Sequence, residues 1–495
     1  GAAAGGGAAA GGGGASGGGA GGGMGGGMGG GTGGGAPMAD GGMDAGVDGG
    51  TDGGPGALPL PFSNCINHSP PTNLAQVSAD LGGAHAAAAW LDPVSQQRFF
   101  AASQRNGDVS SYWALLSNAP GLSGLAIPTD SYFAGAVPLP TGAATALYVQ
   151  VKAPPERNGY PANGASVTLY VDGIAAYNMN NPGLSTFPDV AFASSSLWAD
   201  QQGGVDVAAW SGWQKRRYQL GNEVDLPSTV GFLWPMTHGS GGFSMGSPLW
   251  FACDTLEPVY ARAAVLSNNE YFVLLSTACA SMTVVTVPGT GEFQNDAGGY
   301  AGPKVTLIGN KAQSYLLHGS LNTPGVAPSV TPLTSADPFA GALAVDRARD
   351  AVWLALSSPT GELAIHQLRA STGATAASLV WQGGPGDRLE SVAVDSRGNA
   401  FVVGSVHQAF SIKDAGYTPQ GGSDALAVRM SADGGLHSVG LYGGGGEERF
   451  QSIRSFVQTV PRLLLAGTTD GGFSAGGVTV TAPAAESVVV LECLP

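Results

Sequence analysis

About sixty residues near the C-terminus occur twice in succession, and this internal repeat constrains the fold more strongly than any local pattern does. The first copy runs from Trp381 to Met430 and contains GDRLESVAVDSRGNAFVVGSV followed by GGSDALAVRM. In the second copy Tyr442 takes the place of Trp381, and GEERFQSIRS, LLLAGTT, GGFSAGG and SVVVLEC follow in the same order. The corresponding pairs, 61 to 63 residues apart, are Arg388 and Arg449, Phe410 and Phe473, and Asp424 and Ser487.

Each copy contains several short segments with β-strand character. Val392 and Val394 alternate with small or polar neighbours, and residues 400–403 form a continuous apolar run. Turn residues separate such segments, as in DSRGN at 395–399 and SADGG at 431–435. The aspartates that fall at hairpin positions, where Asp caps turns, are Asp346, Asp350, Asp395 and Asp433. We therefore expect about four strands per copy, each about five residues long and joined by hairpins.

Repeated four-stranded antiparallel units are typical of a β-propeller, in which ring closure protects the edges of the sheets. Residues 65–495 accommodate about seven units of this length. Fainter copies support this number, for example GGFSMG at 241–246 followed by SPLWFAC at 247–253. The sequence does not define the unit boundaries between residues 254 and 335. We predict an all-β fold in which residues 61–495 form a β-propeller of about seven four-stranded blades.

Residues 1–60 differ in composition and are predicted to form a separate, extended arm rich in Gly, Ala and Asp. The first 56 positions hold 31 of the 82 glycines and contain no Lys, Arg or aromatic residue. A segment this poor in apolar surface cannot build its own core. Its other residues recur every four positions, which places them on one face of an extended chain. The positions assigned to an assembly arm are Met24, Met28, Thr32, Asp40, Asp44, Asp48 and Asp52.

The arm has two interpretations. A glycine-rich chain is a flexible tether, but a ribbon with one glycine face also packs closely between neighbouring copies. Its aspartates do not form the DxDxDG pattern of a calcium-binding loop, so an acidic spacer is favoured over a metal site.

Four segments of the repeats resemble the bacterial secreted β-propeller repeats known as SBBP repeats: GGSDALAVRMSADGG, LYGGGGEERF, SVAVDSRGNAFVVG and GGFSAGG. The resemblance is clear over residues 340–495 and weaker before them. It implies a propeller fold and export to the bacterial surface. It implies no enzyme, ligand or catalytic residue.

Four cysteines fit an oxidising compartment and indicate two disulfides. Cys65 lies at the start of the folded region and Cys493 near its end, so a bond between them would join the first and last blades. Cys253 and Cys279 would then pair locally. The sequence leaves the other pairings open.

The sequence contains no motif for catalysis, cofactor binding or a metal site. The seven histidines do not follow a metal-binding spacing. His366 lies in an alternating strand and is expected to be structural. Glu447 and Glu448 follow four glycines, in a loop position open to a ligand. We predict that the protein is not an enzyme and has no catalytic, cofactor-binding or metal-binding residues.

Two functions of different classes follow. The first is a secreted structural subunit whose propellers assemble, as a homo-oligomer or homopolymer, into a cell-surface or extracellular fibre or matrix with the arm between subunits. The second is a monomeric, surface-tethered propeller that binds a glycan or a surface protein, with the arm as a spacer. The net charge of −15 argues against nucleic-acid binding, and no segment is apolar enough to span a membrane.

Overall fold

The computed structural model describes the strands of the folded region and most of its C-terminal half. The described residues are 58–68, 87–91, 98–106, 110–116, 123–126, 131–138, 145–151, 166–171, 174–178, 197–202, 205–219, 222–239, 242–255, 257–286, 302–308, 312–333, 340–457, 460–481 and 487–495. The arm residues assigned from the sequence, Met24 to Asp52, lie outside these ranges. All described residues belong to one unit, Asp48–Pro495.

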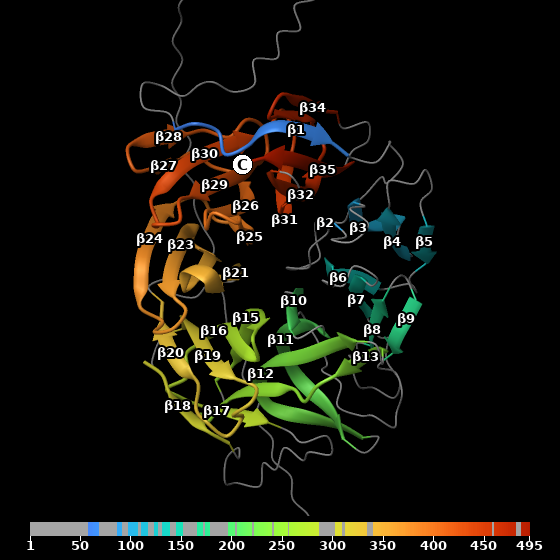
Figure 1. Ribbon diagram of the computed structural model, residues 1–495, viewed down its shortest axis with the longest axis vertical. Coiled ribbons are helices and arrows are strands. Elements are labelled where there is room, and N and C mark those ends of the chain that lie inside the picture. Colours follow the sequence, from blue (N-terminus) through green and yellow to red (C-terminus); the bar gives the residue numbers. More distant parts are fainter. Residues whose placement is uncertain are drawn as a thin grey trace, which may run out of the picture. The chain divides into compact units, whose positions relative to one another are not determined.

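The regular secondary structure of the described residues consists of antiparallel strands and one short 3₁₀ turn (Figure 1). The strands before residue 240 are β1 (Ser63–Asn67), β2 (Ala87–Leu91), β3 (Arg98–Asn106), β4 (Ser110–Leu116), β5 (Ser123–Ala126), β6 (Ser131–Pro138), β7 (Thr145–Val151), β8 (Ser166–Val171), β9 (Ile174–Asn178), β10 (Leu197–Gln202), β11 (Val205–Gln219) and β12 (Asn222–Gly239). The next are β13 (Gly242–Met245), β14 (Leu249–Cys253), β15 (Val259–Ser267), β16 (Glu270–Thr277), β17 (Ser281–Thr286), β18 (Lys304–Thr306), β19 (Gln313–Ser320), β20 (Ser329–Pro332), β21 (Ala340–Asp346), β22 (Ala351–Ser357), β23 (Glu362–Arg369) and β24 (Thr375–Gln382).

The C-terminal strands are β25 (Arg388–Val394), β26 (Ala400–Val406), β27 (Phe410–Ile412), β28 (Ala415–Tyr417), β29 (Asp424–Met430), β30 (Leu436–Tyr442), β31 (Glu448–Val457), β32 (Pro461–Thr469), β33 (Phe473–Ala475), β34 (Val478–Val480) and β35 (Ser487–Leu494). A 3₁₀ turn, η1 (Arg347–Arg349), joins β21 to β22. Among the described residues no helix is long and apolar enough to cross a membrane.

The repeat unit is a four-stranded antiparallel sheet, as the sequence predicts. The described part of the chain contains sheets with the orders β2-β3-β4-β5, β6-β7-β8-β9, β15-β16-β19-β20, β21-β22-β23-β24, β25-β26-β29-β30 and β31-β32-β35-β1. The irregular segments that begin at Phe410 and Phe473 are small hairpins, β27–β28 and β33–β34, inserted between the second and third strands of two successive sheets.

Consecutive sheets of the C-terminal half pack face to face, because their inner strands are apolar on both sides. Every residue of β22 is buried. Its Val352 and Leu354 join the core shared with β15 and β16, whereas Trp353 and Ala355 join the core shared with β25 and β26. A strand buried on both faces appears in the sequence as a continuous apolar run, which explains runs such as residues 400–403.

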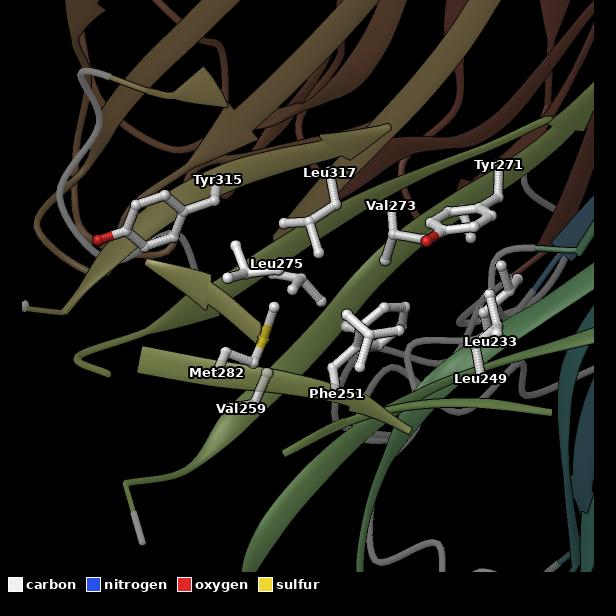
Figure 2. Close-up of a cluster of buried hydrophobic side chains, with 14 of the residues drawn as sticks. Leu233, Leu249, Phe251, Val259, Tyr271, Val273, Leu275, Met282, Tyr315 and Leu317 are labelled. Atoms are coloured by element: carbon white, nitrogen blue, oxygen red, sulfur yellow. The ribbon is translucent and has the colours of Figure 1, made fainter. Parts of the chain in front are cut away.

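The sheet that precedes β15 has more strands than the repeat unit. These extra strands explain why the sequence did not define the boundaries of the repeat units between residues 254 and 335. Its order is β10-β11-β12-β14-β17-β18, with β13 paired to β12. Strands β17 and β18 follow β16 in the chain, but β17 pairs with β14 and β18 pairs with β17, so the chain leaves the next sheet and returns to this one. Their side chains complete the core of Figure 2, where Met282 lies near Phe251 and Leu275. The disulfide Cys253–Cys279 fastens this excursion to β14.

The first described strand closes the last sheet. Strand β1 pairs with β35, the C-terminal strand, as the outermost strand of β31-β32-β35-β1. The disulfide Cys65–Cys493 joins these two strands across 428 residues. Both disulfides therefore have the pairing that the sequence favoured. His68 adds a side-chain contact of 3.0 Å to Glu492.

We predict that the Cys65–Cys493 bond stabilises the fold more than the Cys253–Cys279 bond does. In the loop-entropy account, a bond that closes a loop of 428 residues contributes about 6 kcal/mol, and one that closes about 26 residues contributes about 3.5 kcal/mol. The double variants Cys65→Ala/Cys493→Ala and Cys253→Ala/Cys279→Ala should be compared by urea unfolding. An equal or larger loss in the second variant would contradict the prediction.

Candidate binding pocket

The first strands of four consecutive sheets end around one pocket. Strands β15, β21, β25 and β31 contact one another in this order. A cavity of about 500 Å³ lies where each of them enters the hairpin turn to its second strand. This volume falls in the range of small-molecule sites, roughly 300–1,000 Å³.

Turn chemistry fixes the rim of the pocket. Asn268 and Asn269 connect β15 to β16 with φ angles of 53° and 60°, a left-handed conformation that Asn tolerates better than most residues do. In the β25–β26 turn, Asp395 accepts hydrogen bonds from the backbone N–H groups of Arg397 and Asn399, at 2.8 and 2.9 Å. Gly398 completes this turn at φ 88°. The turn role predicted for Asp395 is thus confirmed.

Two arginines of η1 connect three neighbouring turns. Arg347 donates through Nη2 to the carbonyl oxygen of Ser267, at 3.3 Å, and to the carboxylate of Glu270. Arg349 donates to the carbonyl oxygen of Ser396 at 2.7 Å and to Asp346 at 2.9 Å. These bonds hold the β15–β16, β21–β22 and β25–β26 turns in fixed relative positions.

Glu270 is the centre of a small charged cluster beside the pocket. His318 lies 3.2 Å from its carboxylate, and Arg347 pairs with it. Burial by itself raises the pKa of Glu270, but the hydrogen bonds from His318 and Arg347 outweigh burial and hold its pKa below the ordinary value. The Phe272 ring contacts both partners of Glu270: it stacks on His318 at 4.3 Å and lies 4.8 Å from the Arg347 guanidinium. The charge of Arg347 is therefore already compensated within the protein.

Neutral polar side chains form the remainder of the polar rim. Among the described residues, no side-chain hydrogen-bond partner is found for Ser267, Asn268, Ser396 or Ser455, all of which line the cavity. Valines that end the first strands, and Phe456, supply the apolar lining. These residues carry no sequence motif, and only the hairpin pattern of the repeat could have located them.

Buried carboxylates occupy the opposite turns of the last two repeats, away from the pocket. Asp387 and Glu448 are equivalent in the repeat, and both are fully buried. Asp387 accepts from the N–H of Gly384 at 2.7 Å, and Glu448 accepts from the N–H of Gly444 at 3.1 Å. The prediction that Glu448 is open to a ligand is therefore wrong, because its carboxylate anchors its own glycine loop.

Asp424 adjoins the same glycine loop and is 2% exposed. Its carboxylate accepts one hydrogen bond, from the N–H of Gln420 at 3.0 Å. Burial is the main cause that raises its pKa to about 6, and the negative charge of Glu448 acts in the same direction. Burial also raises the pKa of Glu448.

The other residues named from the sequence lie away from the pocket. His366 is 3% exposed and contacts the Ser378 hydroxyl at 3.0 Å, and burial lowers its pKa, as suits a structural residue. Glu447 pairs with Arg449 at 2.7 Å. Within the described ranges no group of three or more His, Cys, Asp or Glu residues is arranged to hold a metal ion.

Comparisons with known proteins add little to this geometry. No protein family matches the chain, and no curated protein does. Among solved structures, the propeller of Dos1 aligns over 87% of this chain and 94% of its own, with 9% identity and a TM-score of 0.40. Sqt1 from Chaetomium thermophilum aligns over 87% and 91%, with 14% identity and a TM-score of 0.39. A protein of unknown function from Dyadobacter fermentans aligns over 74% and 95%, with 11% identity and a TM-score of 0.39. The resemblance to SBBP repeats stays a prediction.

We predict that Asp424 makes the fold less stable as the pH rises from 4 to 7. Its pKa is higher in the folded than in the unfolded chain, so the folded state binds the proton more tightly. The resulting stabilisation is complete below about pH 4 and is lost as the pH passes about 6, a change on the order of 3 kcal/mol. Asp424→Asn retains an acceptor for Gln420 and should flatten the dependence, measured by urea unfolding between pH 4 and 7.5.

The matched control is Asp433→Asn. Asp433 is a turn residue whose pKa is lowered by the Ser431 hydroxyl, so this variant should retain the decline in stability with rising pH. An equally steep decline in Asp424→Asn would show that other groups cause it.

Proposed function

We propose that this chain is a non-catalytic binding module: a seven-bladed β-propeller, closed by Cys65–Cys493, that holds a ligand in the pocket at the turns after β15, β21, β25 and β31. The order of contacts supports the ring. Strand β31 contacts β2, β2 contacts β6, β6 contacts β10, and β10 contacts β15, which completes the series that continues through β21 and β25. The composite last sheet supports closure by β1.

One observation supports the binding role. The pocket lies at the common end of four first strands, and it combines apolar side chains with neutral polar groups that have no side-chain hydrogen-bond partner among the described residues. A concave site with a few convergent polar groups is the usual form of a ligand site. Acid–base catalysis is less well supported there. Asp395 is fully occupied in its own turn and Asp346 is paired with Arg349.

The disulfides support an extracellular or cell-surface location, because such bonds persist in oxidising compartments. The resemblance to secreted repeats supports the same proposal.

A variant that fills the pocket tests the binding role. Ser396→Trp places an indole at the rim, while the Ser396 carbonyl that binds Arg349 is unchanged. Ser411→Trp, at an exposed position of the β27–β28 hairpin, is the matched control. Thermal unfolding should be followed in the presence of a library of mono- and disaccharides, amino acids and dipeptides. Ligands should raise the melting temperature of the wild type and of Ser411→Trp, but not of Ser396→Trp. Ligands that stabilise all three proteins equally would place the site elsewhere.

A structural role in a fibre or matrix is the second proposal. One described feature favours it: apolar side chains are exposed where the arm meets the edge strand β1. Leu60, just before β1, is 48% exposed, and Ile66, within β1, is 45% exposed. An exposed edge strand is a template for pairing with another chain.

Removal of residues 1–56 tests this second proposal. The truncated chain should remain folded, because Cys65 and β1 are retained, but should no longer form polymers that the full chain forms in electron micrographs. Polymers formed equally by the truncated chain, or a full chain that stays monomeric by sedimentation, would contradict the structural role.

A further inference from the structure

The charged side chains that line the pocket, Asp346, Arg347 and Asp395, all have hydrogen-bond partners within the protein. Arg347 pairs with Glu270, and Asp346 pairs with Arg349 at 2.9 Å. Asp395 accepts three hydrogen bonds from its own turn, and its negative charge also acts on the nearby Arg429 guanidinium. An ionic ligand would lose its hydration on entering, and each charged side chain of the lining is already bonded to other groups of the protein. Burial of a charge without a partner is strongly unfavourable.

The rim side chains that have no hydrogen-bond partner among the described residues are neutral and can act both as donors and as acceptors. They are the hydroxyls of Ser267, Ser396 and Ser455 and the amide of Asn268. A hydroxyl or a primary amide donates and accepts, whereas a carboxylate only accepts and an ammonium only donates. Ligand hydroxyl groups, which also do both, match all four side chains.

The lining below this rim is apolar. Val265, Val345 and Val394 occupy equivalent positions at the ends of β15, β21 and β25, and Phe456 lines the cavity from β31. A pyranose ring presents hydroxyl groups around its edge and C–H groups on its faces. The faces would contact the valines and the aromatic ring while the hydroxyls reach the rim, and a cavity of about 500 Å³ admits a short oligosaccharide.

We propose that the pocket binds an uncharged saccharide and selects against charged sugars of the same size. This inference rests on the proposed binding function and specifies its ligand class. Selectivity comes from the internal pairing of Asp346, Arg347 and Asp395, which leaves hydroxyl and amide groups as the available hydrogen-bonding side chains of the rim.

Two matched pairs of probes test the inference with the full chain. Chitotetraose and its deacetylated, cationic form differ in charge, as do the methyl ester of tetragalacturonate and tetragalacturonate itself. Isothermal titration calorimetry should show binding of a neutral member at least about tenfold tighter than that of its charged counterpart, a difference of about 1.4 kcal/mol. Because no ion pair forms, the affinity should change less than about twofold between low and high salt.

Variants of the rim locate the bound sugar. Ser396→Ala/Ser455→Ala removes two hydroxyls and should weaken binding about ten- to a hundredfold, whereas the exposed control Ser411→Ala should leave it unchanged. Binding of the charged member as tight as that of the neutral one, or no binding of either neutral probe, overturns the inference. If a charged probe binds and Ser396→Trp abolishes that binding, only the ligand class is wrong. If a neutral probe binds Ser396→Trp as well as the wild type, the pocket and the proposed function both fail.

Discussion

Burial of sheets on both faces is the constraint on which the rest of this structure depends. Strands such as β22 and β26 have no exposed residue, so neither face can meet water. A fully buried side chain such as Trp353 contributes roughly 1.5–3 kcal/mol only while the neighbouring sheet covers it. Each such sheet therefore requires a sheet on either side, and an open series would leave one uncovered sheet at each end. Strand β2 of the first four-stranded sheet contacts β31 and β32 of the last one, and the pairing of β1 with β35 adds an edge strand from the start of the described region to that last sheet.

The sequence predicted the parts of the fold that recur at fixed spacing. The equivalence of Asp424 and Ser487 correctly marked the starts of two third strands, β29 and β35. The DSRGN segment at 395–399 correctly marked a hairpin, because an Asp side chain satisfies the backbone of its own turn. The β17–β18 excursion escaped prediction because it depends on pairing with β14, a strand about thirty residues away, and no local pattern encodes such a partner.

The sequence could predict that a pocket forms where equivalent turns meet, but not which residues line it. A repeated hairpin implies that equivalent turns meet at one end of the sheets, but the residues that line the cavity come from four turns spread over nearly two hundred positions. The ionic partners are harder still to foresee. Arg347 is separated by 77 residues from Glu270, and its neighbour Arg349 turns the other way, to Ser396. For Glu448 the sequence instead predicted an accessibility that the structure does not have. The four preceding glycines suggested an accessible loop, but that loop folds over the Glu448 carboxylate and buries it.

The same arginine contacts have two consequences that cannot be separated. By bonding to carbonyl and carboxylate groups of the adjacent turns, Arg347 and Arg349 fix the distance between hairpins that no backbone hydrogen bond of a sheet connects. By forming those bonds they also lose the ability to attract an anion. The same bonds therefore hold the rim of the pocket in place and pair its arginines. In the binding role proposed above, recognition would pass to the serines and to Asn268, which lie in or beside the turns that the arginines hold. Preorganised groups bind at a lower entropic cost than mobile ones do, so under this proposal a neutral ligand would gain from charges that it does not contact.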